Sequence, residues 1–217
     1  MAHFDFPKNL KPIETLDPRL RQPSVEVTKD LIGNKNFQQL LDDMIDYVYG
    51  HKRSKKNATD GKPNVIGLAA VQLGINLRVC VVDVALNMPD NLKDKYHEMR
   101  ILINPKIITI SKERDNDLES CVSCPEMWAT VSRPKIITID AWDRWGNKIR
   151  MDGKDWVAKL FQHEIDHMNG TLFIDRVLEN KIHWVKDGEE LKNYRTDEDW
   201  KKIVPPERYG FKKFIKD

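Results

Sequence analysis

The stretch FQHEIDHMNG, residues 161–170, places His163 and His167 four positions apart, with Glu164 beside the first histidine. Residues i and i+4 project from one face of an α-helix, so both imidazoles can reach a single metal ion if the stretch is helical. Glu164 then lies where a general base for a metal-bound water is needed, as in the H-E-x-x-H pattern. Gly170 adds a signal for the end of the helix. The alternative is an ordinary helix with partly exposed histidines.

The segments on either side of this stretch predict an α+β fold rather than alternating β-α-β units. A first helix is expected over 36–50, with Asn34 or Asn36 at its start and Gly50 at its end. Its apolar residues recur at helical spacing: Leu40, Leu41, Met44, Ile45 and Val48. Four β-rich runs follow, at 77–84, 100–110, 134–142 and 147–151, with a hairpin turn at 143–148. We expect small antiparallel or mixed β-sheets to pack around a central helix over 155–170, which carries the two histidines.

The composition of the 217 residues suits one domain with a hydrophobic core, or one domain with an extension, because 40% are hydrophobic and 32% charged. A net charge of +2 without a dense basic stripe predicts no direct nucleic-acid binding. No apolar run approaches the roughly 20 residues of a membrane-spanning helix. The first residues lack the features of a signal or transit peptide, and three cysteines indicate reduced thiols, so a cytoplasmic protein is expected.

The third metal ligand would decide the chemistry, and the residues alone leave three alternatives open. Cys121 or Cys124, in LESCVSCPEMW, would complete a Cys-His-His site with one open position. Both cysteines together would give a closed, non-catalytic structural zinc site, in which Glu164 has no use. A zinc endopeptidase would instead take a downstream glutamate, because Phe173 stands where a third histidine would be expected. The candidates for that glutamate are Glu179, Glu189 and Glu190.

Two further segments give the chain a likeness to a known family. NVIGLAAVQLGI, ESCVS and QHEIDH occur in this order, with INPKI and GTLFIDR between and after them. With these motifs the chain resembles peptide deformylase, whose motifs are G-x-G-L-A-A-x-Q, E-G-C-L-S and Q-H-E-x-D-H. The matched region runs from about the first helix to Arg176, which is most of the chain.

The resemblance implies that Cys121, His163 and His167 bind one metal ion, usually ferrous iron, with water in the fourth place. Zn²⁺, Ni²⁺ or Co²⁺ can occupy the same ligands. Glu164 would be the general base and acid. The resemblance further implies hydrolysis of the formyl group of N-formylmethionyl nascent peptides, with release of formate.

Other residues have implied roles around the metal. Gln72 and the backbone N–H of Val122 would stabilise the oxyanion. Three residues are expected at the substrate: Gly67, where a peptide backbone would approach closely, and Ile66 and Leu160, which would line an apolar pocket for the methionine side chain. An ion pair between Glu119 and Arg133 would orient the cysteine segment, and Asp166 would support the site from outside the ligand set.

The chain departs from the family motifs at three positions, where Val65 and Ser120 replace glycines and Val122 replaces a leucine. If the glycine at 120 needs a positive φ, serine would add strain of about 1–3 kcal/mol. We expect one catalytic domain over 1–176 with a polar loop at 51–64. A polar extension over 177–217 is a candidate contact for the ribosome.

Overall fold

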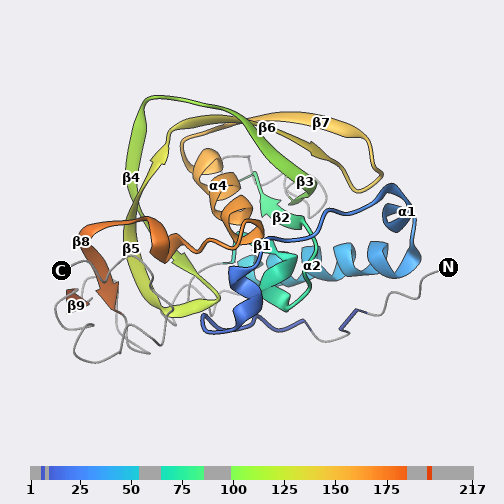
Figure 1. Cartoon of the computed structure of the whole chain (residues 1–217), viewed down its shortest axis with the longest axis horizontal. Coiled ribbons are helices and arrows are strands. Elements are labelled where there is room, and N and C mark those ends of the chain that lie inside the picture. Colours follow the sequence, from blue (N-terminus) through green and yellow to red (C-terminus); the bar gives the residue numbers. More distant parts are fainter. Residues whose placement is uncertain (1–5, 8–9, 54–64, 86–98, 185–194, 197–217) are drawn as a thin grey trace.

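The computed structural model describes residues 6–7, 10–53, 65–85, 99–184 and 195–196 (Figure 1). The α- and 3₁₀-helical (η) segments are η1 (Pro18–Arg21), α1 (Lys29–Ile32), α2 (Lys35–Arg53), η3 (Ala70–Leu73), α4 (Trp156–Met168) and η5 (Phe173–Arg176). The strands are β1 (Gly67–Ala69), β2 (Val79–Asp83), β3 (Met99–Ile110), β4 (Arg114–Cys121), β5 (Cys124–Pro134), β6 (Ile136–Trp142), β7 (Lys148–Lys154), β8 (Val177–Trp184) and β9 (Arg195–Thr196). All paired strands are antiparallel, and the predicted α+β class is confirmed.

Helix α2 carries the predicted apolar face, and all five residues of that face are buried. The Asn34 side chain accepts hydrogen bonds from the backbone N–H groups of Asn36 and Phe37, so Asn34 caps the helix. The predicted end at Gly50 is wrong, since α2 continues to Arg53. A Cβ on Gly50 would meet no atom within 4 Å, so this glycine has no close contact to preserve. The rest of the predicted 51–64 loop, residues 54–64, lies outside the described residues.

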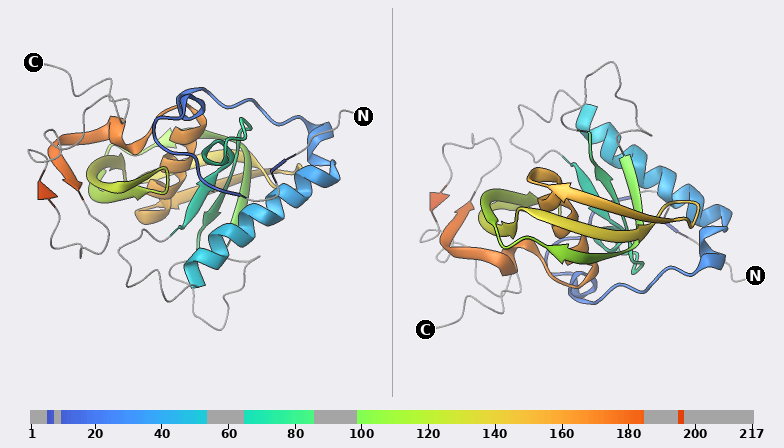
Figure 2. Two further views of the ribbon diagram at one scale, coloured as in Figure 1. Left: turned by 90° about the horizontal axis from the view of Figure 1, so that it is seen from below. Right: turned by 90° about the horizontal axis from the view of Figure 1, so that it is seen from above.

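The first sheet has the order β1-β2-β3-β6-β7 and contains the four predicted runs. Strand β2 is buried on both faces, which explains its continuous apolar sequence. Val79 and Val81 pack in the cluster that contains the α2 residues, whereas Cys80 and Val82 pack in the cluster that contains the α4 residues. The sheet therefore separates α2 from α4 (Figure 2).

The second sheet, with the order β4-β5-β8-β9, was not predicted. Strand β4 reads RDNDLESC and carries too few apolar residues to show a strand pattern. Strand β8 pairs with β5 and begins at residue 177, where the polar extension was expected to start. The predicted division between 176 and 177 stays a prediction, and most of the extension lies outside the described residues.

Helix α4 packs against strands of both sheets, namely β7, β1 and β2 of the first and β5 of the second (Figure 1). Gly153 of β7 allows this approach, because a Cβ there would lie 2.9 Å from Phe161 and 3.1 Å from the Ala158 backbone. Gly170 follows the helix with a φ of 72°, as its position in the sequence suggested.

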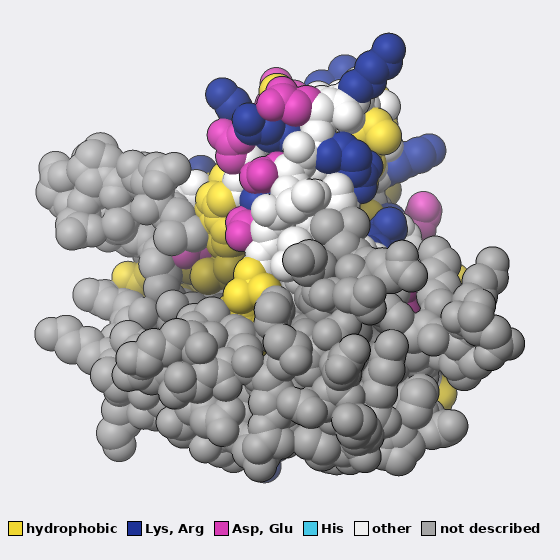
Figure 3. Space-filling model, turned by 90° about the vertical axis from the view of Figure 1, so that its left-hand side faces the viewer, with side chains coloured by type: hydrophobic (Ala, Val, Ile, Leu, Met, Phe, Trp, Pro, Cys, Tyr) yellow, Lys and Arg dark blue, Asp and Glu magenta, His cyan; other side chains and the backbone are white. Residues whose placement is uncertain are grey.

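The surface of the described residues carries both signs of charge. Figure 3 shows lysine and arginine side chains interspersed with aspartate and glutamate on the described part of one face. Among the helices of the described ranges, none combines the length and the apolar character that crossing a bilayer requires.

Candidate metal centre

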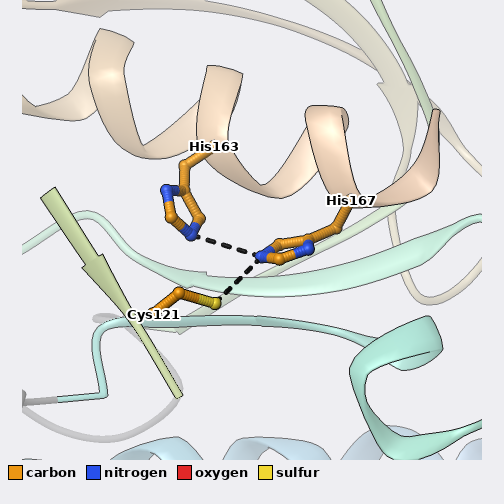
Figure 4. A group of neighbouring side chains, drawn as sticks. All are labelled: Cys121, His163 and His167. Carbon is orange, nitrogen blue, oxygen red and sulfur yellow. Dashed lines mark hydrogen bonds between the residues drawn. The ribbon is translucent and has the colours of Figure 1, made fainter. Parts of the chain in front are cut away.

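Three potential ligand atoms converge from α4 and from the end of β4 (Figure 4). His163 Nε2 lies 3.2 Å from His167 Nε2, which lies 3.3 Å from Cys121 Sγ. All three atoms fall within 4.8 Å of one another. Ligand atoms bound at about 2.0–2.3 Å to a tetrahedral ion are about 3.5 Å apart, so this spacing fits a single ion.

Cys121 occupies the last position of β4 and is followed by a two-residue turn, Val122–Ser123, before Cys124 opens β5. Burial raises the pKa of the Cys121 thiol. Its sulfur accepts hydrogen bonds from Gln72 Nε2, at 3.2 Å, and from the Ser123 N–H, at 3.4 Å. These donors stabilise a thiolate in this position.

Cys124 stands outside the group of converging ligand atoms found among the described residues. It is fully buried and packs in an apolar cluster with Met127 and Phe173. The Thr15 hydroxyl lies 3.3 Å from its sulfur. The described geometry therefore favours a three-residue site over the closed four-ligand alternative.

His163 is oriented by a buried chain of charged side chains. Its Nδ1 lies 2.9 Å from Glu119 Oε2. Arg133 donates to both Glu119 oxygens, at 2.5 and 2.9 Å, so the expected ion pair is present. Arg133 also donates to Asp166, at 2.8 Å, and the half-exposed Arg176 donates to both Asp166 oxygens, at 2.6 Å. Such contacts fix the ring orientation of a metal ligand.

The ionisation states of Glu119 and Arg133 are determined by the side chains that they contact. Burial raises the pKa of Glu119, but hydrogen bonds with Arg133 and His163 outweigh burial and lower the pKa to about 2. Burial likewise opposes the charged form of Arg133, yet its bonds to Glu119 raise its pKa above the ordinary value. Glu119 is thus ionised and Arg133 protonated across the physiological range.

Glu164 lies beside His163 on α4 and is buried. Burial is the main cause that raises its pKa to about 7. Among the described residues, none donates a hydrogen bond to its Oε2. A buried carboxyl with a pKa near neutrality and one oxygen without a partner is suited to exchange protons with a bound reactant.

Gly67 of β1 faces this carboxyl directly. A Cβ at this position would overlap Glu164 Oε1 and would lie 2.8 Å from Leu160 Cδ1. Glycine was expected here for the approach of a peptide backbone. The structure adds a second reason, which is that the Glu164 side chain occupies the space of a Cβ.

Gln72 lies in η3, immediately after β1, and is buried. Its Oε1 accepts from the Ala69 N–H at 2.8 Å, which turns the amide nitrogen toward Cys121. The Ile13 N–H donates to the Gln72 carbonyl at 2.7 Å and holds the backbone of η3 from the N-terminal side.

A cavity of about 250 Å³ opens beside the converging ligands. The three substrate residues expected from the sequence, Ile66, Gly67 and Leu160, all line it, as do the expected oxyanion residues Gln72 and Val122. Trp128, Trp156 and Lys159 also line it but were missed. Trp156 and Lys159 precede His163 by seven and four residues, so helical spacing contained the signal. Trp128 pairs with Ser120 across β4 and β5, a register that the sequence did not reveal.

The departures from the family motifs fit the backbone. Among the described non-glycine residues, a positive φ occurs only at Asn104 and Asp155, so Ser120 does not carry the strain considered above. Val65 is buried in the cluster beneath α2. Of the glutamates in the endopeptidase alternative, Glu189 and Glu190 lie outside the described residues, as does the side chain of Glu179.

Sequence comparisons identify the family of the chain. A family model described as Polypeptide deformylase matches residues 10–182. Peptide deformylase of Bartonella tribocorum is 37% identical over 161 residues, which cover 74% of this chain and 80% of the relative. Peptide deformylase 2 of Vibrio cholerae is 36% identical over 179 residues, which cover 82% and 92% of the two chains.

Solved structures agree with these relatives. The peptide deformylase of Synechococcus elongatus matches with a TM-score of 0.65 and 32% identity, over 78% of this chain and 81% of the other. That of Thermotoga maritima matches with a TM-score of 0.63 and 30% identity, over 78% and 97%. The matched residues include both histidines, Cys121 and the strands around them, and the chain belongs to the polypeptide deformylase family.

Proposed function

We propose that Cys121, His163 and His167 hold one divalent metal ion on α4, the central helix of the site, and that Glu164 moves the protons of the reaction. The family removes the formyl group from N-formylmethionyl nascent peptides, a hydrolysis in N-terminal protein processing. The observation that carries the proposal is the convergence of the three ligand atoms within 4.8 Å, beside a carboxyl whose pKa is raised to about 7.

The donor set fits the proposed ion. One thiolate and two imidazoles suit Fe²⁺, Zn²⁺, Ni²⁺ and Co²⁺, and three protein ligands leave a position open, as in catalytic sites. We propose ferrous iron as the resident ion. When bound, it supplies Lewis acidity, which polarises the formyl carbonyl and makes a water molecule nucleophilic near neutral pH.

Glu164 takes a proton from the attacking water and passes it to the amine that leaves. A pKa near 7 suits both steps, because the group gains and loses a proton at little cost at neutral pH. The absence of a partner for Oε2 among the described residues leaves that oxygen available to the reactants.

Gln72 and the Val122 backbone N–H stabilise the negative charge that develops on the formyl oxygen. The Gln72 amide already points toward Cys121, at 3.2 Å, and is held by the Ala69 N–H. A preorganised donor of this kind contributes about 3 kcal/mol to transition-state stabilisation.

The peptide substrate is expected to lie between the two sheets. Strand β1 is the edge of the first sheet and β4 the edge of the second, and both contribute residues to the cavity. An extended peptide can pair with such edges, while the apolar side chains of Ile66 and Leu160 contact its methionine. We also propose that the protein is cytoplasmic and that residues 177–217 contact the ribosome. Both follow from the substrate, because nascent formylated chains leave the ribosome in that compartment.

Formate release from a formyl-Met tripeptide tests the proposal. The protein is purified without oxygen and loaded with Fe²⁺, and the Glu164→Gln variant is compared with Glu113→Gln, which changes an exposed glutamate of a surface ion pair. We expect Glu164→Gln to keep its metal and to release formate about 10²–10⁴-fold more slowly, with no change for Glu113→Gln. A folded, metal-loaded wild type that releases no formate, or a Glu164→Gln variant of unchanged rate, would overturn it.

A further inference from the structure

The turn that presents Cys121 also presents a second thiol directly opposite. Cys121 and Cys124 are cross-strand partners in the β4–β5 hairpin, separated by Val122–Ser123. The pairing register shifts between Ser120 and Cys121, so the spacing follows from the turn rather than from a regular ladder. Residues that flank a two-residue β-turn have Cα atoms less than about 7 Å apart, and a disulfide spans about 4.4–6.8 Å. Both side chains belong to the same buried cluster.

Access to the two sulfurs differs. Cys121 lines the cavity, and 4% of its surface is exposed. Cys124 is fully buried, in contact with the Thr15 hydroxyl and the apolar cluster behind the hairpin. A small oxidant in the cavity therefore meets Cys121 before Cys124.

We propose that Cys124 is a resolving thiol, which captures Cys121 as a reversible disulfide when a peroxide oxidises the metal-free site. Cys124 is available for this role because it stands outside the converging ligand group. The inference rests on the proposed function only in taking Cys121 as a metal ligand.

The chemistry balances in two steps. Cys121 Sγ attacks the peroxide, an S–O bond forms, the O–O bond breaks, and the leaving hydroxide takes the thiol proton to become water. Cys124 Sγ then attacks the Cys121 sulfenic sulfur, the S–S bond forms, the S–O bond breaks, and the second hydroxide leaves as water with the Cys124 proton. Two thiols lose two electrons, and hydrogen peroxide is reduced to two waters.

The disulfide would prevent Cys121 from binding the metal and would also protect its sulfur from further oxidation. A sulfenic acid without a nearby thiol is oxidised further to sulfinic and sulfonic acids, which a thiol reductant does not reverse. A disulfide is reversed by thiol exchange. The site would thus change between a metal-binding dithiol and an inactive disulfide, instead of being lost.

Peptide mapping of the metal-free full chain tests this inference. Wild type, Cys124→Val and the matched control Cys80→Ala, a buried cysteine of β2, are treated with hydrogen peroxide and alkylated before or after dithiothreitol. Trypsin does not cleave before Pro134, so residues 115–135 form one peptide that contains Cys121 and Cys124 but not Cys80. Alkylation is the readout, because Met127 in the same peptide also takes up oxygen.

In wild type and Cys80→Ala we expect the peroxide-treated peptide to resist alkylation. After dithiothreitol the same peptide should accept two alkyl groups, and the protein should bind Co²⁺ again. In Cys124→Val we expect two or three added oxygens on Cys121 and lasting loss of Co²⁺ binding. Equal, irreversible oxidation of Cys121 in wild type and Cys124→Val would overturn the inference. Cys124→Ser replaces the valine variant if that one does not fold. If the disulfide forms but the metal-loaded protein releases no formate, the proposed function is wrong and the inference about Cys124 stands.

Discussion

The contact between Gly67 and Glu164 joins the substrate strand to the proposed base. Glu164 of α4 is buried, and its side chain lies where any residue larger than glycine at 67 would place a Cβ. The position of the carboxyl therefore depends on a residue that carries no chemistry of its own.

Gly67→Ala should displace Glu164 and slow formate release by about a hundredfold, because a shift of about 1 Å at a reacting group has effects of this size. Metal content should be unchanged, because the atoms nearest to the new methyl group belong to Glu164 and Leu160 and not to a proposed metal ligand. Gly50→Ala is the matched control: its Cβ meets nothing within 4 Å in α2, and it should stabilise the protein by about 1 kcal/mol. A normal rate in Gly67→Ala would show that the carboxyl has room to move.

The raised pKa of Glu164 predicts a dependence of stability on pH in the metal-free protein. The carboxyl holds its proton up to about pH 7 when folded but only to its ordinary pKa of 4.5 when unfolded. Its contribution is therefore complete below pH 4.5 and is lost as the pH rises through 7, by at most about 3 kcal/mol. Urea unfolding of wild type and Glu164→Gln at several pH values measures the difference. Parallel curves from pH 4.5 to 7.5 would contradict the assigned pKa.

At the scale of elements, the buried charges connect β4, β5, α4 and η5. Arg133 of β5 reaches Glu119 of β4 and Asp166 of α4, and Arg176 of η5 reaches Asp166 from the surface. These contacts link the second sheet, which presents Cys121, to the helix that presents both histidines. The relative position of the three ligands follows from this connection.

Removing one of these charged side chains should lower the free energy of unfolding more when that side chain is buried. Arg133→Met would leave the buried Glu119 carboxylate without its arginine and Asp166 with Arg176 alone, and should lower the free energy of unfolding by about 3–5 kcal/mol. Arg176→Met removes a cation that is half exposed and should cost about 1 kcal/mol or less. Chemical denaturation of both variants tests the order, which equal losses would contradict.

At the scale of the whole molecule, the sequence predicted four of the five strands of the first sheet and both long helices, because the strands are rich in β-branched residues and the apolar residues of the helices repeat at helical spacing. The second sheet escaped prediction because β4 is largely polar and is held by pairing with β5 rather than by its own pattern. Gly50 was misjudged because the packing of α2 on the sheet outweighs the low helix propensity of one exposed glycine.

The residues of the candidate site likewise fall into those that the sequence predicted and those that required the folded structure. Helical spacing alone brought His163, Glu164 and His167 together, since these residues lie on one turn of α4. Spacing did not decide between Cys121 and Cys124, and only the family motifs singled out Cys121 and Gln72. The pairing of the β4–β5 hairpin, which brings Cys121 within reach of the histidines and leaves Cys124 outside the ligand group, requires the folded chain.

The most direct test of the central claim measures metal bound per chain and formate released in the same anaerobic, Fe²⁺-loaded sample. Wild type and Cys124→Ser should each bind one ion and release formate, because Cys124 stands outside the converging ligands. Cys121→Ser should bind little metal and release none. A folded Cys121→Ser chain that retains the ion and the wild-type rate would show that Cys121, His163 and His167 are not the catalytic metal site.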